Sequence, residues 1–180
     1  MVYTYKECIE LFGSHYALAQ AISLKKIFKI KEGIYSNAKK PKLLEIFVKE
    51  HNDAVFTLES AFYYFGISDV IPDNYVVATD KDASKYKENY IQQYFINGGL
   101  INIGVTQITY NGVNIKIFNK ERLLIELIRY KNKIPFDYYK EIINYYRNHL
   151  NDIDLSLVAE YLDSFPKKKL ITKTIQLEVL

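Results

Sequence analysis

Residues 25–36 decide the fold of the N-terminal part, and they run Lys-Lys-Ile-Phe-Lys-Ile-Lys-Glu-Gly-Ile-Tyr-Ser. Apolar and charged side chains alternate from Phe28 to Lys31, the pattern breaks at Gly33, and apolar residues resume at Ile34. Alternation with a period of two is typical of a strand with one buried face, and glycine supplies the positive φ of a hairpin turn. The stretch therefore predicts a two-stranded ribbon, with Phe28 and Ile30 on its inner face and lysines on its outer face.

Two short helices are predicted directly upstream of this ribbon. Apolar residues recur every three or four positions over residues 3–12 and again over residues 15–24, which is the spacing of one buried helix face. Gly13 would end the first helix, because glycine adopts the left-handed conformation at low cost, and Ser14 is a good N-cap for the second. The order helix, tight turn, helix and basic ribbon predicts a winged helix-turn-helix domain over residues 1–40.

Positive charge is concentrated in this N-terminal part. Residues 1–50 contain nine lysines and five glutamates, a net charge of +4, whereas residues 51–180 contain fifteen basic and sixteen acidic residues, a net charge of −1. A cationic patch on a neutral body favours a module that binds a polyanion. We therefore expect binding to double-stranded DNA, although a small helical hairpin with a solvated lysine face explains the same charges.

The winged helix-turn-helix hypothesis assigns roles to individual side chains. The second helix of such a motif lies in the major groove, where glutamine can pair bidentately with adenine, while lysines on the ribbon contact phosphates. The predicted DNA-binding residues are Ser14, His15, Tyr16, Gln20, Ser23, Lys25, Lys26, Lys29 and Lys31.

The remainder of the chain predicts a linking helix over residues 41–53 and an α+β domain over residues 54–180. Alternating side chains predict strands at the middle of this domain, and Asn111-Gly112 is a typical two-residue hairpin turn. The predicted strands cover residues 100–105 and 107–117. Helical periodicity follows over residues 120–131, 135–150 and 154–164, and the tail from residue 167 fits either a helix or a strand. Strands first and helices after favour the α+β fold class, and we expect short antiparallel strands and a hairpin packed with helices in this domain.

Composition argues against several classes of protein. The single cysteine, Cys8, permits no intrachain disulfide, and the N-terminus lacks the basic and apolar regions of a signal peptide. No apolar run approaches the ~20 residues of a membrane helix. These features predict a cytoplasmic protein that does not associate with a membrane.

The sequence contains no strong signature of an enzyme. The three histidines are far apart and match no metal-ligand spacing, and the chain lacks a Walker loop and the GxGxxG and GxSxG motifs. We therefore predict no catalytic residue, metal, cofactor or small-molecule ligand. One alternative is a metal-dependent nuclease that uses Asp80, Asp82 and Lys85 beside a strand, and a solvated loop explains these three residues equally well.

Three blocks follow one another along the chain. The first is residues 27–36, a basic strand that leads into Gly-Ile-Tyr. The second is residues 57–72, which contains Thr-Leu-Glu-Ser-Ala and Gly-Ile-Ser-Asp-Val-Ile-Pro. The third is residues 113–127, a strand that runs into Asn-Lys-Glu-Arg-Leu-Leu-Ile-Glu-Leu. In this order the blocks resemble the AbiEi-type antitoxin and transcriptional regulator family of bacterial abortive-infection (type IV) toxin–antitoxin systems.

The resemblance implies a two-part function. The N-terminal domain would bind repeats in its own promoter and repress its operon, and the C-terminal domain would counter a cognate nucleotidyltransferase toxin without the need for a stable complex. Glu121 and Arg122 are the candidate antitoxin residues, although helix-face ion pairs, Glu121–Arg122 and Glu126–Arg129, explain them at least as simply. A second hypothesis is a protein-interaction module that docks a toxin directly and does not bind DNA.

Overall fold

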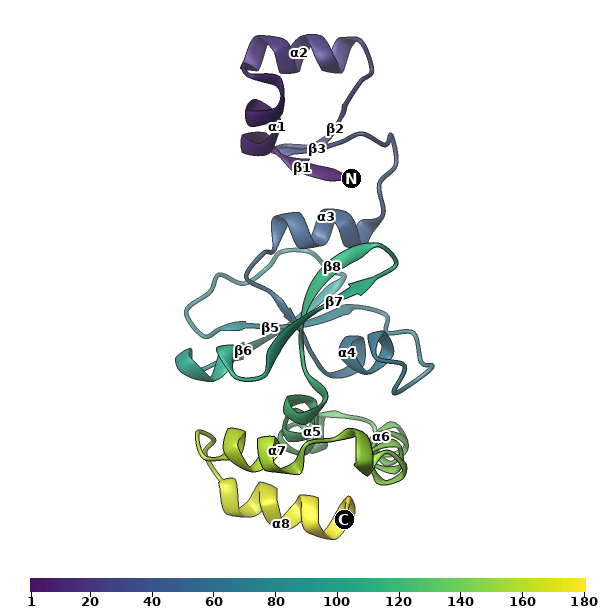
Figure 1. The fold of residues 1–180 in the computed structure, drawn as a ribbon, viewed down its shortest axis with the longest axis vertical. Coiled ribbons are helices and arrows are strands. Elements are labelled where there is room, and N and C mark those ends of the chain that lie inside the picture. The colour runs from purple at the N-terminus through teal and green to yellow at the C-terminus, as the bar shows by residue number, and fades with distance from the viewer. The chain divides into compact units, whose positions relative to one another are not determined.

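The protein has a mixed α+β fold, which confirms the predicted fold class. The structure is a computed structural model that describes residues 1–180. It contains eight α-helices and two β-sheets (Figure 1). The chain divides into two compact units, Met1–Asp53 and Ala54–Leu180. None of the helices combines the length and the apolar character that a membrane span requires.

The first unit contains three strands and three helices. They are β1 (Val2–Thr4), α1 (Tyr5–Phe12), α2 (His15–Ser23), β2 (Phe28–Lys31), β3 (Ile34–Ser36) and α3 (Leu43–Glu50). The strands form one antiparallel sheet in the order β1-β3-β2.

Strand β1 takes the place of the first turn of the helix predicted over residues 3–12. Thr4 is extended and caps α1, since its hydroxyl accepts a hydrogen bond from the backbone N–H of Glu7 at 3.3 Å. In return, the Glu7 carboxylate accepts one from the backbone N–H of Thr4 at 2.7 Å. This reciprocal capping box fixes the start of the helix two residues later than the apolar spacing indicates.

The predicted ribbon is present in the first unit. Phe28 and Ile30 are half-buried while the lysines between and after them are exposed, so the inner and outer faces are as predicted. Gly33 has a φ of +73° in the turn between β2 and β3. The core beneath the ribbon includes the buried side chains of Cys8, Leu18, Ala21, Ile27 and Tyr35.

Helix α3 forms within the predicted linking segment and belongs to the first compact unit. Its buried residues are Leu44 and Phe47. Three ion pairs connect it to the rest of the unit: Lys49 with Glu7 at 2.6 Å, Lys31 with Glu50 at 2.5 Å, and the N-terminal ammonium with Glu45 at 3.2 Å. This helix therefore stabilises the N-terminal sheet and α1.

The second unit is built on a five-stranded mixed sheet. Its strands are β4 (Val55–Phe56), β5 (Tyr75–Asp80), β6 (Ile91–Ile96), β7 (Val105–Tyr110) and β8 (Val113–Phe118), in the order β6-β5-β4-β8-β7. The pairs β4/β5 and β7/β8 are antiparallel, as predicted, but β5/β6 and β4/β8 are parallel, so the prediction of antiparallel strands is wrong for these two pairs. The predicted hairpin turn is confirmed, because Asn111 and Gly112 have φ angles of +49° and +82°.

One helix of the second unit, α4 (Leu58–Tyr64), lies between β4 and β5 in the chain, and the other four follow the last strand. These four are α5 (Lys120–Arg129), α6 (Phe136–Asn148), α7 (Leu155–Leu162) and α8 (Lys168–Glu178), and the first three match the predicted helical periodicity. Short 3-10 helices are η1 (Gly98–Asn102), η2 (Lys131–Lys133) and η3 (Leu150–Asp152). Figure 1 shows α5 to α8 gathered on one side of the sheet. The predicted strand over residues 100–105 is wrong, because this segment contains the end of η1 and β7 begins only at Val105.

Candidate functional site

The exposed face of α2 carries the residues predicted to contact DNA. Gly13 is left-handed, with a φ of +84°, and its N–H donates to the carbonyl of Ile9 at 2.8 Å, which ends α1. The Ser14 hydroxyl then accepts from the backbone N–H of Ala17 at 3.1 Å and starts α2. The helix buries Leu18 and Ala21 in the core. The side chains exposed on the opposite face include those of His15, Tyr16, Gln20 and Ser23.

Two of these exposed side chains also make contacts within the unit. The Ser23 hydroxyl donates to the backbone carbonyl of Gln20 at 2.8 Å. The imidazole of His15 lies 6.4 Å from the ring of Tyr5, measured between centroids. Gln20 and Tyr16 are both exposed, and the Tyr16 side chain is 79% exposed.

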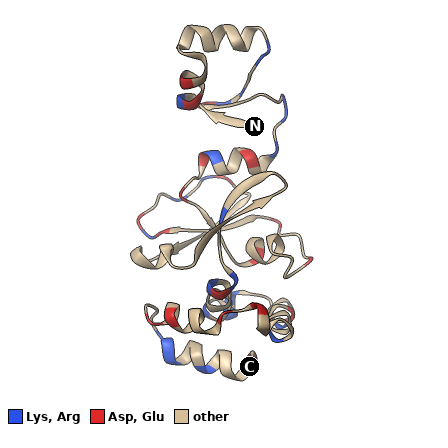
Figure 2. Cartoon of the chain, viewed as in Figure 1, with Lys and Arg blue, Asp and Glu red and all other residues tan.

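The predicted lysines lie along the end of α2 and strand β2. Lys25 adopts a left-handed conformation with a φ of +56°, and the N–H of Lys26 donates to the carbonyl of Ala21 at 2.9 Å. This C-terminal cap ends α2 and redirects the chain toward strand β2. Lys25, Lys26 and Lys29 are exposed, and Figure 2 shows the basic residues of this connection in blue.

Lys31 differs from the other three lysines. Its ammonium lies 2.5 Å from the carboxylate of Glu50, and its side chain is 41% exposed. From the sequence, Glu32 is the nearest acidic residue, but α3 supplies the ion-pair partner. We therefore expect Lys31 to contribute less to the binding of a polyanion than Lys25, Lys26 and Lys29.

Arg122 lies in the interior of the second unit and is 0% exposed. Its Nε donates to Glu126 Oε1 at 2.7 Å, and its Nη1 donates to the backbone carbonyls of Leu100 at 2.7 Å and Ile103 at 3.0 Å. The guanidinium carbon is 4.4 Å from the ring centroids of both Phe118 and Phe165. Burial lowers the pKa of the guanidinium, and the charge of Glu126 opposes that shift.

These contacts correct the ion pairs predicted for α5. Glu126 does pair with Arg129, whose Nη1 lies 2.6 Å from Oε1, and the same carboxylate also forms an ion pair with Arg122. Glu121 does not pair with Arg122, because adjacent residues on a helix do not face each other whereas residues four apart do. Instead, Glu121 Oε1 accepts from the backbone N–H of Asp154 at 3.2 Å, at the start of α7.

Gly104 allows the segment after η1 to pass close to Arg122. It has a φ of +73°, and a Cβ at this position would lie 2.6 Å from the Cβ of Arg122 and 2.9 Å from Asn119 Oδ1. Asn119 itself caps α5, since its Oδ1 accepts from the N–H of Arg122 at 2.9 Å. The sequence signal for this buried cluster is weak, because Arg122 is followed directly by the apolar run 123–125 and the glycine that packs against it lies eighteen residues earlier, at Gly104.

The proposed nuclease residues lie at the end of β5. Asp80 Oδ1 accepts from the backbone N–H of Asp82 at 3.0 Å, which is a local turn that aspartate often forms. Asp82 and Lys85 are exposed. A Cβ added to Gly98 would lie 3.9 Å from Asp80 Oδ2.

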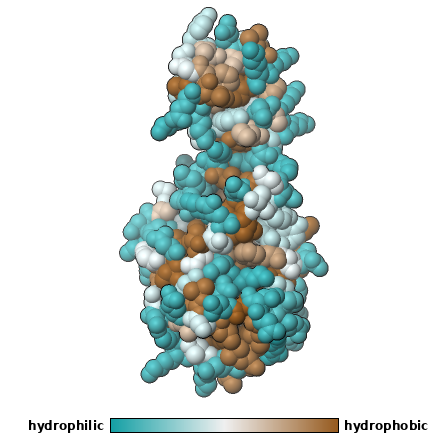
Figure 3. Space-filling view, viewed as in Figure 1, coloured by the Kyte–Doolittle hydropathy of each residue, from teal (hydrophilic) through white to brown (hydrophobic).

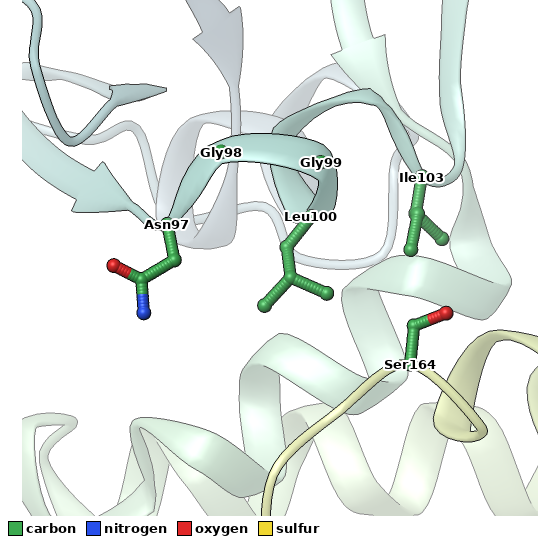
Figure 4. A pocket seen from close by; sticks show the side chains of 6 residues that line it. All are labelled: Asn97, Gly98, Gly99, Leu100, Ile103 and Ser164. Carbon is green, nitrogen blue, oxygen red and sulfur yellow. The ribbon is translucent and has the colours of Figure 1, made fainter.

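A pocket of about 390 Å³ lies beside η1, and Figure 4 shows its side chains. It is lined by Asn97, Gly98, Gly99, Leu100, Ile103 and Ser164. None of these six residues has an ionisable side chain, so the lining supplies neither a general base nor a charged group beside Asp80. The local turn explains the aspartates more directly than a catalytic role does.

Comparisons with known proteins assign no family: no family model matches the chain, and no curated protein matches it.

Proposed function

We propose that the chain is a DNA-binding antitoxin of the AbiEi type, which acts in the cytoplasm and represses its own operon. The observation that carries this proposal is the arrangement of the first unit, where two helices joined by a tight turn are followed by an antiparallel ribbon. The polar face of the second helix and three lysines at the helix end and ribbon are exposed. We interpret residues 1–40 as a winged helix-turn-helix and residues 54–180 as the antitoxin domain.

Two kinds of contact with DNA follow from this interpretation. Exposed residues of α2 would reach base edges in the major groove, with Gln20 as the residue best suited to adenine. Lys25, Lys26 and Lys29 would contact phosphates, which provides affinity but no sequence information. Specificity and affinity should therefore respond to different substitutions.

Gln20→Ala is expected to relax sequence preference. Loss of one bidentate contact with adenine is worth about 1–3 kcal/mol, so the ratio of dissociation constants for nonspecific and promoter DNA should fall roughly 10-fold. The measurement is fluorescence anisotropy with a duplex from upstream of the coding region and a scrambled duplex. Gln107→Ala, at an exposed position of β7, is the matched control and should leave the ratio unchanged. An unchanged ratio in Gln20→Ala would show that Gln20 does not contact a base.

Neutralisation of the toxin is expected to depend on the second unit. A nucleotidyltransferase gene should lie directly downstream, and co-expression of this chain should restore the growth of cells that express that enzyme. A variant with Lys25, Lys26 and Lys29 changed to Ala should still protect the cells, because these lysines lie outside residues 54–180. Loss of protection in this variant at equal expression would contradict the separation of the two functions.

A protein-interaction module is the second candidate, and exposed leucines at the C-terminal end of the chain favour it. Leu170 and Leu177 on α8 and Leu180 after it are each at least 60% exposed, and Figure 3 shows apolar surface over the C-terminal helices. Apolar side chains that gather on one face are typical of protein contact sites. Co-purification of the toxin with this chain, together with no shift of promoter DNA, would favour this candidate over the first.

A further inference from the structure

A cavity of about 540 Å³ lies in the second unit, at residues that the proposed function does not use. Helix α4, the segment 70–74, strands β5 and β6 and the start of α6 form its walls. Four carboxyl side chains line it, from Glu59, Asp73, Asp137 and Glu141. None of its lining residues is a lysine, arginine or histidine, so the cavity has no cationic side chain of its own.

Glu59 is the most buried of these four carboxyl side chains, and one of its oxygens has no hydrogen-bond partner. It lies in the first turn of α4, and its Oε2 is fully buried and has no hydrogen-bond partner. Burial raises the pKa of this carboxyl above its ordinary value, because a charged oxygen without a counter-ion is costly in a medium of low polarity. A cation in the cavity would remove that cost.

Helix α6 supplies another wall of the cavity. Tyr138 and Glu141 line the cavity together with Glu59. Burial and the charges of Glu59 and Glu141 raise the pKa of Tyr138 to about 12, and a hydrogen bond with Ser68 opposes this shift. Glu141 is held in place, since its Oε1 accepts from the Ser68 hydroxyl at 2.9 Å. The aromatic ring of Tyr138 adds a surface that favours cations.

Apolar residues complete the cavity. Val70 and Ile71 are exposed, Ile71 by 72%, and with Pro72 and Pro135 they line the same space as the carboxylates. No three of the carboxylates converge within 4.8 Å of one another, as ligands of a single metal ion would. The combination of separated carboxylates, a phenol and apolar side chains suits a larger, partly apolar cation.

We propose that this cavity binds an organic cation, an ammonium or guanidinium group on an apolar stem, with Glu59 as its counter-ion. The stem would pack on Val70 and Ile71, and the charged group would lie between Glu59, Tyr138 and Glu141. This proposal is independent of DNA binding, because every residue involved belongs to residues 54–180. Such a cation has two sources, a free polyamine-like molecule or a lysine or arginine side chain of a partner protein.

Titration calorimetry on the full-length chain tests the proposal with three probes. They are agmatine, a short peptide with one arginine flanked by leucines, and hexanoate as an anion of similar size. We expect saturable binding of agmatine or the peptide and none of hexanoate. Tighter binding of the peptide would identify a protein side chain as the source, and tighter binding of agmatine would identify a free amine.

Glu59→Gln should weaken binding of the cationic probe at least 10-fold. The matched control is Glu160→Gln at an exposed position of α7, which should leave the affinity unchanged. Glu59→Gln removes a buried charge, so its melting temperature at pH 7 should equal or exceed that of the parent, and lost binding would not result from unfolding. The proposal is overturned if neither cation binds saturably, if hexanoate binds as well as agmatine, or if Glu59→Gln binds like the parent.

Discussion

Arg122→Met is expected to destabilise the second unit by about 3–5 kcal/mol, which is the usual cost of removing one partner from a buried, hydrogen-bonded ion pair. The substitution removes the Arg122 donor from the carbonyls of Leu100 and Ile103. It also removes the planar group between Phe118 and Phe165. Urea denaturation followed by circular dichroism measures the change in the free energy of unfolding.

Two further variants separate charge from geometry at this site. Arg122→Lys should recover little of the lost stability, because an ammonium cannot reproduce the forked donors or stack between two rings. Arg147→Met is the control, since the Nε of this exposed arginine makes a single hydrogen bond of 2.6 Å to the Glu178 carbonyl, and it should cost less than about 1 kcal/mol. If Arg122→Met unfolds at the same urea concentration as the parent, the buried contacts do not stabilise the unit.

The same result bears on Arg122 as a candidate antitoxin residue. A side chain that is 0% exposed cannot touch a partner in this structure, so any effect of Arg122→Met on toxin neutralisation should follow the loss of folded protein. Glu121 is partly exposed and ties the start of α7 to α5. Of the two candidates, only Glu121 could contact another molecule directly.

The variant with Lys25, Lys26, Lys29 and Lys31 changed to Ala is expected to lose promoter affinity on the order of 10²-fold at about 0.1 M salt. Each phosphate contact contributes about 0.9 to the slope of log affinity against log salt concentration, so three contacts should flatten that slope by about 3. The loss should be similar for promoter and scrambled DNA, because phosphates carry no sequence. Fluorescence anisotropy across a salt series gives both quantities.

Lys31 provides an internal test of this prediction. Its ion pair with Glu50 should make Lys31→Ala alone the weakest of the four single substitutions. The variant with only Lys25, Lys26 and Lys29 changed to Ala has a matched charge control, in which Lys81, Lys85 and Lys87 in an exposed loop of the second unit are changed to Ala and which should bind DNA like the parent. Equal affinity of the quadruple variant and the parent would mean that the ribbon does not contact DNA.

Local patterns in the sequence predicted much of the fold. The alternation of residues 28–31, the junction Gly13-Ser14 and the turn Asn111-Gly112 each depend on backbone preferences and on neighbours a few positions away. The helices from Lys120 onward follow from the same short-range spacing. These features are encoded locally, and for that reason the α+β class and the exposed lysine face could be predicted without coordinates.

Contacts between distant segments could not be predicted in this way. Strand β1 has three residues, too few for a pattern, and it forms only because β3 offers a partner. Strands β5 and β6 are parallel although the short connection 81–90 would favour an antiparallel pair. A period-two pattern also predicted a strand where η1 forms.

Tertiary structure alone decided which charged groups are buried or paired in both units. In the second unit, Arg122 holds the end of η1 and the residue after it through two carbonyls about twenty residues earlier in the chain. In the first unit, α3 brings Glu50 to Lys31. The cavity around Glu59 likewise combines α4, β5, β6 and α6. The sequence by itself determined which faces are basic or apolar and where the chain turns, because those properties depend on near neighbours. Which charges are buried, paired or left open was decided only when distant segments packed together, since burial and pairing are properties of the packed interior.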